Sequence, residues 1–187
     1  PSNSFISKTD KIEEEQCFPL KVFVCENCKL VQLDEFKKAS DIFSEEYVYF
    51  SSMSSSWLKH SKKYVDKMMG EFGIHQNSLV TEIASNDGYL LQYFKAENVN
   101  VVGIEPTAST AKVSAEKGIE TVVDFFGERL ATKLTNQGKQ SDLILGNNVL
   151  AHVPDINDFV KGIKILLKED GIVTMEFPHL LQLVKHN

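Results

Sequence analysis

The chain has 187 residues with 20 Lys and Arg against 26 Asp and Glu, a formal charge of −6, and 42% of its residues are hydrophobic. This composition is that of a globular protein, and it excludes disorder and a fibrous repeat. No apolar run approaches the roughly 20 residues of a membrane-spanning helix, and the first residues do not form a secretory leader. With three cysteines and an acidic balance, we expect a cytoplasmic protein that binds neither nucleic acid nor membrane.

The first 33 residues predict a small β-hairpin module. Residues 19–24 alternate like a strand, and residues 30–33 form the returning strand. Cys25 and Cys28 lie between these two strands as a tight Cys-x-x-Cys knuckle.

Residues 34–73 predict a polar and aromatic connecting segment followed by one helix. The serines at 54–56 can cap this helix, and Gly70 and Gly73 mark its end. Trp57 and His60 lie on the helix, where we expect His60 to be structural.

From residue 74 to residue 187, short apolar runs alternate with amphipathic segments, which predicts βα units. The expected strands cover residues 79–83, 99–104, 120–123, 142–145 and 172–177. The expected helices cover residues 89–97, 109–117, 128–136 and 156–167, with a turn at Asp170-Gly171 before the fifth strand. The fold class is therefore α/β, with a partial, Rossmann-like sheet of about five parallel strands behind the hairpin module.

Polar residues follow each expected strand, at the place where ligands bind in an open α/β sheet. The turn over residues 84–88 can expose backbone N–H groups to a ligand. Glu105 follows Glu82 by 23 residues, close to the spacing of about 20 at which an acid accepts hydrogen bonds from ribose. The expected cofactor-binding residues are Glu82, Ala84, Ser85, Asn86, Asp87, Gly88, Glu105, Pro106, Asp124, Phe125, Phe126, Asn147 and Asn148.

Charge and glycine content favour an adenosine-type cofactor without phosphates over a dinucleotide. A dinucleotide needs close glycine approaches to its pyrophosphate, and this turn has a single glycine, Gly88. The acids in the expected crevice would oppose a phosphate. Because S-adenosylmethionine has a cationic sulfonium and no phosphate, we expect S-adenosylmethionine and methyl transfer.

The chain resembles the S-adenosylmethionine-dependent sugar C-methyltransferases, which have a class I methyltransferase fold behind an N-terminal zinc-binding domain. The resemblance covers nearly the whole chain and is most specific in residues 82–88, 148–155 and 176–180. Ala84 and Asn86 stand where glycines are common in methyltransferases, and the family shares this departure. The resemblance implies that a methyl group is transferred to the ring carbon beside the ketone of a nucleotide-linked 4-keto-6-deoxy sugar.

The resemblance also directs attention to four residues for the chemistry. His152 and His179 each follow a strand end and are candidates for the base that removes the proton α to the carbonyl, or for the donor that holds the enolate. Tyr47 and Tyr49 are candidates to cover the cofactor or to orient the sugar ketone. Loop bracing, packing and an aromatic cluster under a loop are the structural alternatives for these positions.

By the same resemblance, Cys25 and Cys28 are expected to hold a structural zinc whose other Cys pair lies before Pro1, and Cys17 is expected to be free. A further Tyr-His-Glu-His stretch and a second α/β domain are expected after Asn187. We therefore expect residues 74–187 to form a truncated cofactor-binding domain that does not turn over alone. Two alternatives remain: an NAD-dependent sugar-nucleotide oxidoreductase or epimerase, and a non-catalytic module that binds S-adenosylmethionine and zinc.

Overall fold

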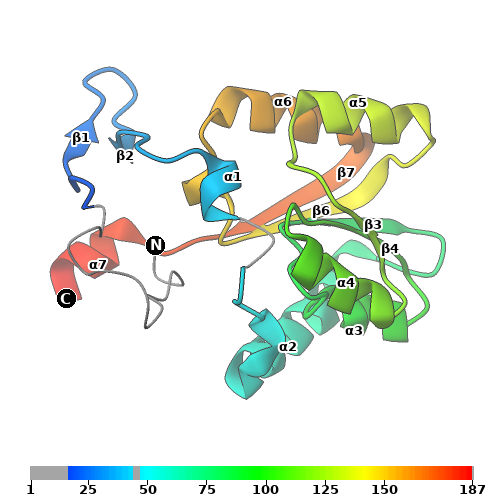
Figure 1. Cartoon of the computed structure of the whole chain (residues 1–187). Helices are drawn as coiled ribbons and strands as arrows, with labels where there is room; N and C mark the ends of the chain where they lie inside the picture. Colours follow the sequence, from blue (N-terminus) through cyan, green and yellow to red (C-terminus); the bar gives the residue numbers. More distant parts are fainter. Residues whose placement is uncertain (1–16, 44–46, 187) are drawn as a thin grey trace.

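A five-stranded parallel sheet forms the centre of the computed structural model, which describes residues 17–43 and 47–186 (Figure 1). The strand order is β5-β4-β3-β6-β7, and every neighbouring pair is parallel. The strands are β3 (Leu79–Ile83), β4 (Asn100–Ile104), β5 (Glu120–Val122), β6 (Ser141–Asn147) and β7 (Leu167–Glu176). The predicted α/β sheet is confirmed, and its order reverses between β3 and β6, where a ligand crevice is expected.

Helices cover both faces of this sheet (Figure 1). One face carries α2 (Ser55–Phe72), α3 (Leu91–Ala96) and α4 (Ala108–Glu116), and the other carries α5 (Glu128–Asn136) and α6 (Ile156–Leu166). Successive residues of a strand point to opposite faces, so Val80 packs in the core under α2 and α3, while Ile83 packs in the core under α5 and α6.

Local signals set the helix ends that the sequence predicts. The Ser54 hydroxyl accepts a hydrogen bond of 3.3 Å from the Trp57 amide at the start of α2, and Gly73 ends this helix with a φ of 62°. In α6, the buried Gly162 brings the helix against the backbone of Gly127, just before α5. A Cβ on Gly162 would lie 2.8 Å from the Gly127 carbonyl carbon and 2.9 Å from its oxygen.

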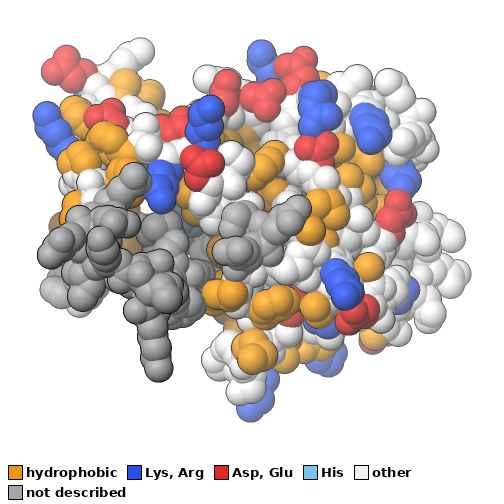
Figure 2. Space-filling view, in the orientation of Figure 1, with side chains coloured by type: hydrophobic (Ala, Val, Ile, Leu, Met, Phe, Trp, Pro, Cys, Tyr) orange, Lys and Arg blue, Asp and Glu red, His pale blue; other side chains and the backbone are white. Residues whose placement is uncertain are grey.

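The N-terminal hairpin is formed by β1 (Val22–Val24) and β2 (Val31–Leu33), which pair antiparallel as predicted. All six of these residues are exposed. Figure 2 shows hydrophobic side chains on the surface of the hairpin region. Over α5 and α6, by contrast, charges of both signs are interspersed. The connecting segment contains α1 (Ala39–Ile42) and the 3₁₀ turn η2 (Ser51–Met53). A second 3₁₀ turn, η3, spans Leu150–His152, and α7 spans Leu180–His186.

The turn predicted at Asp170-Gly171 lies inside the range of β7 instead of before it, and the chain does fold back here, since a Cβ on Gly171 would lie 3.0 Å from the Lys168 carbonyl oxygen. This strand begins earlier than expected, with Leu167 paired to Ser141, and the register then shifts before Ile172 pairs with Leu143. The turn-forming pair therefore marks an irregularity inside a long strand.

In the part of the chain that the structure describes, no helix combines the length and the apolar character needed to cross a membrane.

Candidate functional site

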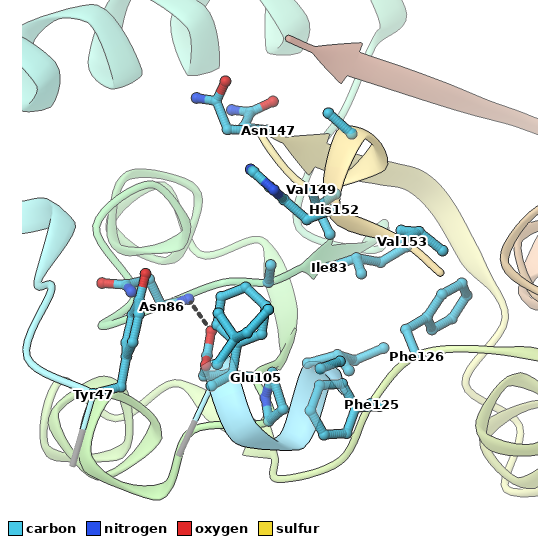
Figure 3. Close-up of a pocket in the computed structure, with 18 of the residues that line it drawn as sticks. Tyr47, Ile83, Asn86, Glu105, Phe125, Phe126, Asn147, Val149, His152 and Val153 are labelled. Carbon is cyan, nitrogen blue, oxygen red and sulfur yellow. Dashed lines mark hydrogen bonds between the residues drawn. The ribbon is translucent and has the colours of Figure 1, made fainter. Parts of the chain in front are cut away.

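A cavity of about 1150 Å³ opens at the carboxyl ends of β3, β4 and β6 (Figure 3). Residues after the strands form its floor, and α1 together with the segment before α2 contributes to its walls. Figure 3 shows Phe125 and Phe126 at one end, with Tyr47 and Asn86 at the other. The sequence-predicted residues that line the cavity are Tyr47, Tyr49, Ala84, Asn86, Glu105, Pro106, Asp124, Phe125, Phe126, Asn147, Asn148 and His152.

Three other residues predicted to bind the cofactor belong to the turn after β3 but lie beneath the cavity lining. Ser85 is fully buried beside Gly103, and Asp87 forms an ion pair of 3.5 Å with Lys117. Gly88 has a φ of 73° and packs tightly enough that a Cβ would lie 2.6 Å from the Ile119 side chain. These residues shape the turn from below.

Glu82 also lies behind the lining, on β3, where its side chain is completely buried. Within the described part of the chain, neither of its carboxylate oxygens has a hydrogen-bond partner. Burial raises the pKa of Glu82 well above its usual range; the nearby Tyr89 hydroxyl lowers this pKa, and the charges of Glu105 and Asp87 raise it further.

The Glu105 carboxylate organises the floor of the cavity. Its Oε2 atom accepts a hydrogen bond of 2.9 Å from the Asn86 amide, as drawn in Figure 3. Its Oε1 atom accepts bonds from the amide of Thr107, at 2.9 Å, and from the Thr107 hydroxyl. Because Oε2 has one protein donor, it retains a lone pair that can accept a hydrogen bond from a ligand hydroxyl.

The segment from Tyr47 to Ser52, here called the strap, is tied across the turn after β3. The Asn86 side chain accepts a hydrogen bond of 2.9 Å from the Ser51 amide and donates one of 3.0 Å to the Tyr49 carbonyl. The Ser109 hydroxyl donates to the Tyr47 carbonyl at 3.1 Å. Burial, followed by the charge of Glu105, raises the pKa of the Tyr47 hydroxyl, which is therefore neutral and able to donate at ordinary pH.

Asn86→Gly tests this connection, because glycine adopts the positive φ of Asn86, 50°, without strain but lacks the bridging amide. We expect hydrogen exchange of the Ser51 amide to accelerate by roughly tenfold or more, since its buried acceptor is lost. Exchange of the Val80 amide in the sheet serves as the control. Unchanged exchange at Ser51 would contradict the strap's attachment through Asn86.

The cavity lining is acidic, with carboxylates from Asp41, Glu105, Asp124, Asp155 and Asp158 and, among the described residues, no Lys or Arg. Asp124 accepts hydrogen bonds from Arg129 at 2.7 Å and from the Phe125 amide at 2.9 Å. Asp155 caps α6 by accepting two amide bonds of 3.0 Å. A cationic ligand suits such a lining better than a phosphate does.

The two candidate histidines are placed differently. His152 lies on η3, is exposed, and lines the cavity near Asn147 (Figure 3). His179 is exposed and does not line the cavity. Its Nδ1 atom instead accepts a hydrogen bond of 3.4 Å from the Gln182 amide in α7. Of the two, His152 is the one placed to meet a ligand in this cavity.

Sequence reasoning missed four aromatic residues of the lining, Phe43, Trp57, Tyr89 and Phe159. The rings of Trp57 and Tyr89 stack at 6.1 Å. Trp57 also stacks on His60 at 5.0 Å, and His60 forms a 2.8 Å contact with Glu176 at the end of β7. Tyr89 directly follows the turn after β3, which was the signal that could have identified it. Trp57 gave no such signal, because it shares its helix with a stripe of core residues.

The hairpin carries two thiols that suit a metal knuckle. The Cys25 amide donates to the Leu30 carbonyl at 2.9 Å, which closes the hairpin end. The backbone amide of Cys28, followed by that of Asn27, lowers the pKa of the Cys25 thiol and so favours the thiolate that zinc binds. Cys25 and Cys28 fit half of a four-ligand site, and the described residues bring no third Cys, His, Asp or Glu into such a group with them.

Comparison with known proteins finds matches for the N-terminal region and for the sheet domain. Residues 1–43 match a family model described as "Putative zinc binding domain", and residues 81–173 match one described as "Methyltransferase domain". The C-methyltransferase NovU of Streptomyces niveus is 31% identical over 186 residues, which is 100% of this chain and 44% of that protein. The chain therefore spans less than half the length of this relative.

Two solved structures share the fold. The PH0226 protein of Pyrococcus horikoshii OT3 matches with a TM-score of 0.61 and 19% identity, over 81% of this chain and 71% of that one. An S-adenosylmethionine-dependent methyltransferase of Clostridium acetobutylicum ATCC 824 matches with a TM-score of 0.55 and 15% identity, over 68% of this chain and 53% of that one. These two structures show a shared fold, whereas the family models and the full-chain alignment show that the chain carries a methyltransferase domain behind a zinc-binding-type region and is similar to a C-methyltransferase.

Proposed function

We propose that the chain holds S-adenosylmethionine in the cavity and, as part of a longer protein, methylates a ring carbon of a nucleotide-linked 4-keto-6-deoxy sugar. The observation that carries this proposal is the large acidic cavity at the ends of β3, β4 and β6, without Lys or Arg among its described lining residues. The full-chain similarity to a C-methyltransferase supports carbon as the acceptor. The sugar itself rests on the resemblance of the sequence motifs.

The lining residues fit the parts of this cofactor. The free lone pair of Glu105 Oε2 suits a ribose hydroxyl, and the rings of Phe125 and Phe126 suit the two faces of an adenine. When bound, S-adenosylmethionine supplies an electrophilic methyl group on a positively charged sulfur. The surrounding carboxylates favour that charge, whereas they would repel the pyrophosphate of a dinucleotide.

For the transfer step, we assign proton removal to an imidazole nitrogen of His152, which lines the same cavity as the proposed cofactor residues. To the neutral hydroxyl of Tyr47 and the side-chain amide of Asn147, which also line the cavity, we assign hydrogen bonds to a ketone oxygen that gains negative charge. His179 has no part in this assignment, because it lies outside the cavity lining.

Calorimetric titration of the chain with S-adenosylhomocysteine tests the cofactor assignment, with NAD as the control ligand. We expect S-adenosylhomocysteine to bind and NAD not to bind. A concentration of 100 times the dissociation constant should then stabilise the fold by about 2.7 kcal/mol in a thermal shift measurement. Binding of NAD alone would replace this proposal with the oxidoreductase alternative.

A further inference from the structure

The buried Glu82 carboxyl is the least satisfied polar group described in the fold. It is 0% exposed, and neither oxygen has a hydrogen-bond partner among the described residues. An ionised carboxylate in such a place is unfavourable, because burial removes it from water and the nearby Tyr89 hydroxyl offsets this only in part. A buried polar group so poorly satisfied calls for an explanation, which the surroundings of Glu82 supply.

Glu82 lies directly behind the wall of the proposed cofactor cavity. Ile83 and Ala84, the next residues along the chain, both line the cavity. Tyr89, whose hydroxyl acts on the Glu82 carboxyl, lines it as well. A charge placed in the cavity is therefore close to Glu82, with the lining residues between them.

The groups that shift the pKa of Glu82 are acids and a phenol, and one of them, Asp87, is itself paired with Lys117 at 3.5 Å. Glu105 from the end of β4 and Asp87 from the turn after β3 both oppose its negative charge. Tyr64 from α2 and Tyr89, just before α3, act on it from the face of the sheet that carries these two helices. Among the groups that act on Glu82, there is no Lys or Arg to balance an ionised carboxylate. A cationic ligand in the cavity can supply the positive charge that favours the ionised form.

We propose that the Glu82 carboxyl holds a proton while the cavity is empty and releases it when a cationic ligand occupies the cavity, so that this residue senses the charge of the cofactor. The inference rests on the proposed function, in which the ligand before transfer carries a sulfonium and the product carries a neutral thioether. Loss of the sulfonium charge lets Glu82 take up a proton again. Glu82 thereby favours the cofactor that still has its methyl group over the product.

The first half of the proposal is tested without any ligand. The unfolded chain releases the Glu82 proton near pH 4.3, whereas the folded chain keeps it, so rising pH favours the unfolded chain. Relative to Glu82→Gln, the folding equilibrium constant of the wild type should fall by about tenfold for each pH unit above this value, until the folded protein also ionises. Glu116→Gln, at an exposed position of α4, is the control. Parallel pH profiles of the wild type and Glu82→Gln, measured by urea unfolding, would overturn the proposal.

The second half is tested by calorimetry of the 187-residue chain in two buffers with different ionisation enthalpies. S-adenosylmethionine should release between about 0.5 and 1 proton per site at neutral pH, S-adenosylhomocysteine should release fewer, and Glu82→Gln should remove the difference. Binding of both ligands with equal proton release would overturn charge sensing and leave the cofactor assignment intact. Binding of neither ligand would instead overturn the proposed function, and the inference with it.

Discussion

Glu105→Gln should weaken the binding of S-adenosylhomocysteine by roughly 10- to 100-fold and lower the free energy of unfolding by about 3 kcal/mol. In the wild type, both carboxylate oxygens accept bonds from buried donors, on Asn86 and Thr107. A glutamine has one oxygen, so its NH₂ group must face one of these donors. The turn after β3 then loses its anchor at the point where the ligand ribose is proposed to bind.

Isothermal calorimetry and urea unfolding check both parts of this expectation. Glu116→Gln again provides a matched control, because Glu116 is an exposed residue of α4 for which no change in binding is expected. Wild-type affinity in Glu105→Gln would show that this residue does not contact the cofactor. Wild-type stability would show that the amide donors find other acceptors.

Gly162→Ala and Gly70→Ala should change stability in opposite directions, although both replace a glycine in a helix. Around Gly70 in α2 there is nothing within 4 Å of an added Cβ, so the higher helix propensity of alanine should stabilise the fold by about 0.5–1 kcal/mol. At Gly162 in α6, the added methyl meets the Gly127 backbone, which has no rotamer that avoids it. We expect destabilisation by about 2–3 kcal/mol.

The Gly162→Ala change should also reach the cavity, because the same methyl would lie 3.1 Å from the ring of Phe126, a lining residue. Urea unfolding of the two variants measures the stabilities, and calorimetry with S-adenosylhomocysteine measures the affinities. Gly70→Ala should bind as the wild type does. Stabilisation by both substitutions would mean that α5 and α6 separate at little cost.

The elements of the sheet domain could be predicted from the sequence, because buried parallel strands and amphipathic helices have different hydrophobic periods. The helix predicted over residues 128–136 agrees with α5 residue for residue. Pairing between distant strands leaves no local pattern, which is why the early start of β7 at Leu167 was not foreseen. Asp170-Gly171 has the composition of a turn and forms one, but because Leu167 before it and Ile172 after it both pair with β6, the turn interrupts the strand instead of preceding it.

The candidate site was predictable to the extent that it follows strand ends. Asn86, Glu105 and Asn147 were expected there from their positions after β3, β4 and β6, and all three line the cavity. Glu82 was expected among them but belongs to the opposite face of β3 from Ile83, since residues alternate along a strand. The contact between His60 and Glu176 joins residues 116 positions apart, which no local motif reveals.

The cavity wall crosses the boundary between the two regions that relatives share with this chain. Ala39, Ile42 and Phe43 line the cavity, yet they lie in the region that matches the zinc-binding family model. Hybrid proteins that exchange this region at residue 43 would therefore carry foreign side chains into the ligand site. A hybrid that keeps the ligand site intact would therefore have to keep α1 together with the sheet domain, since α1 forms part of the cavity wall.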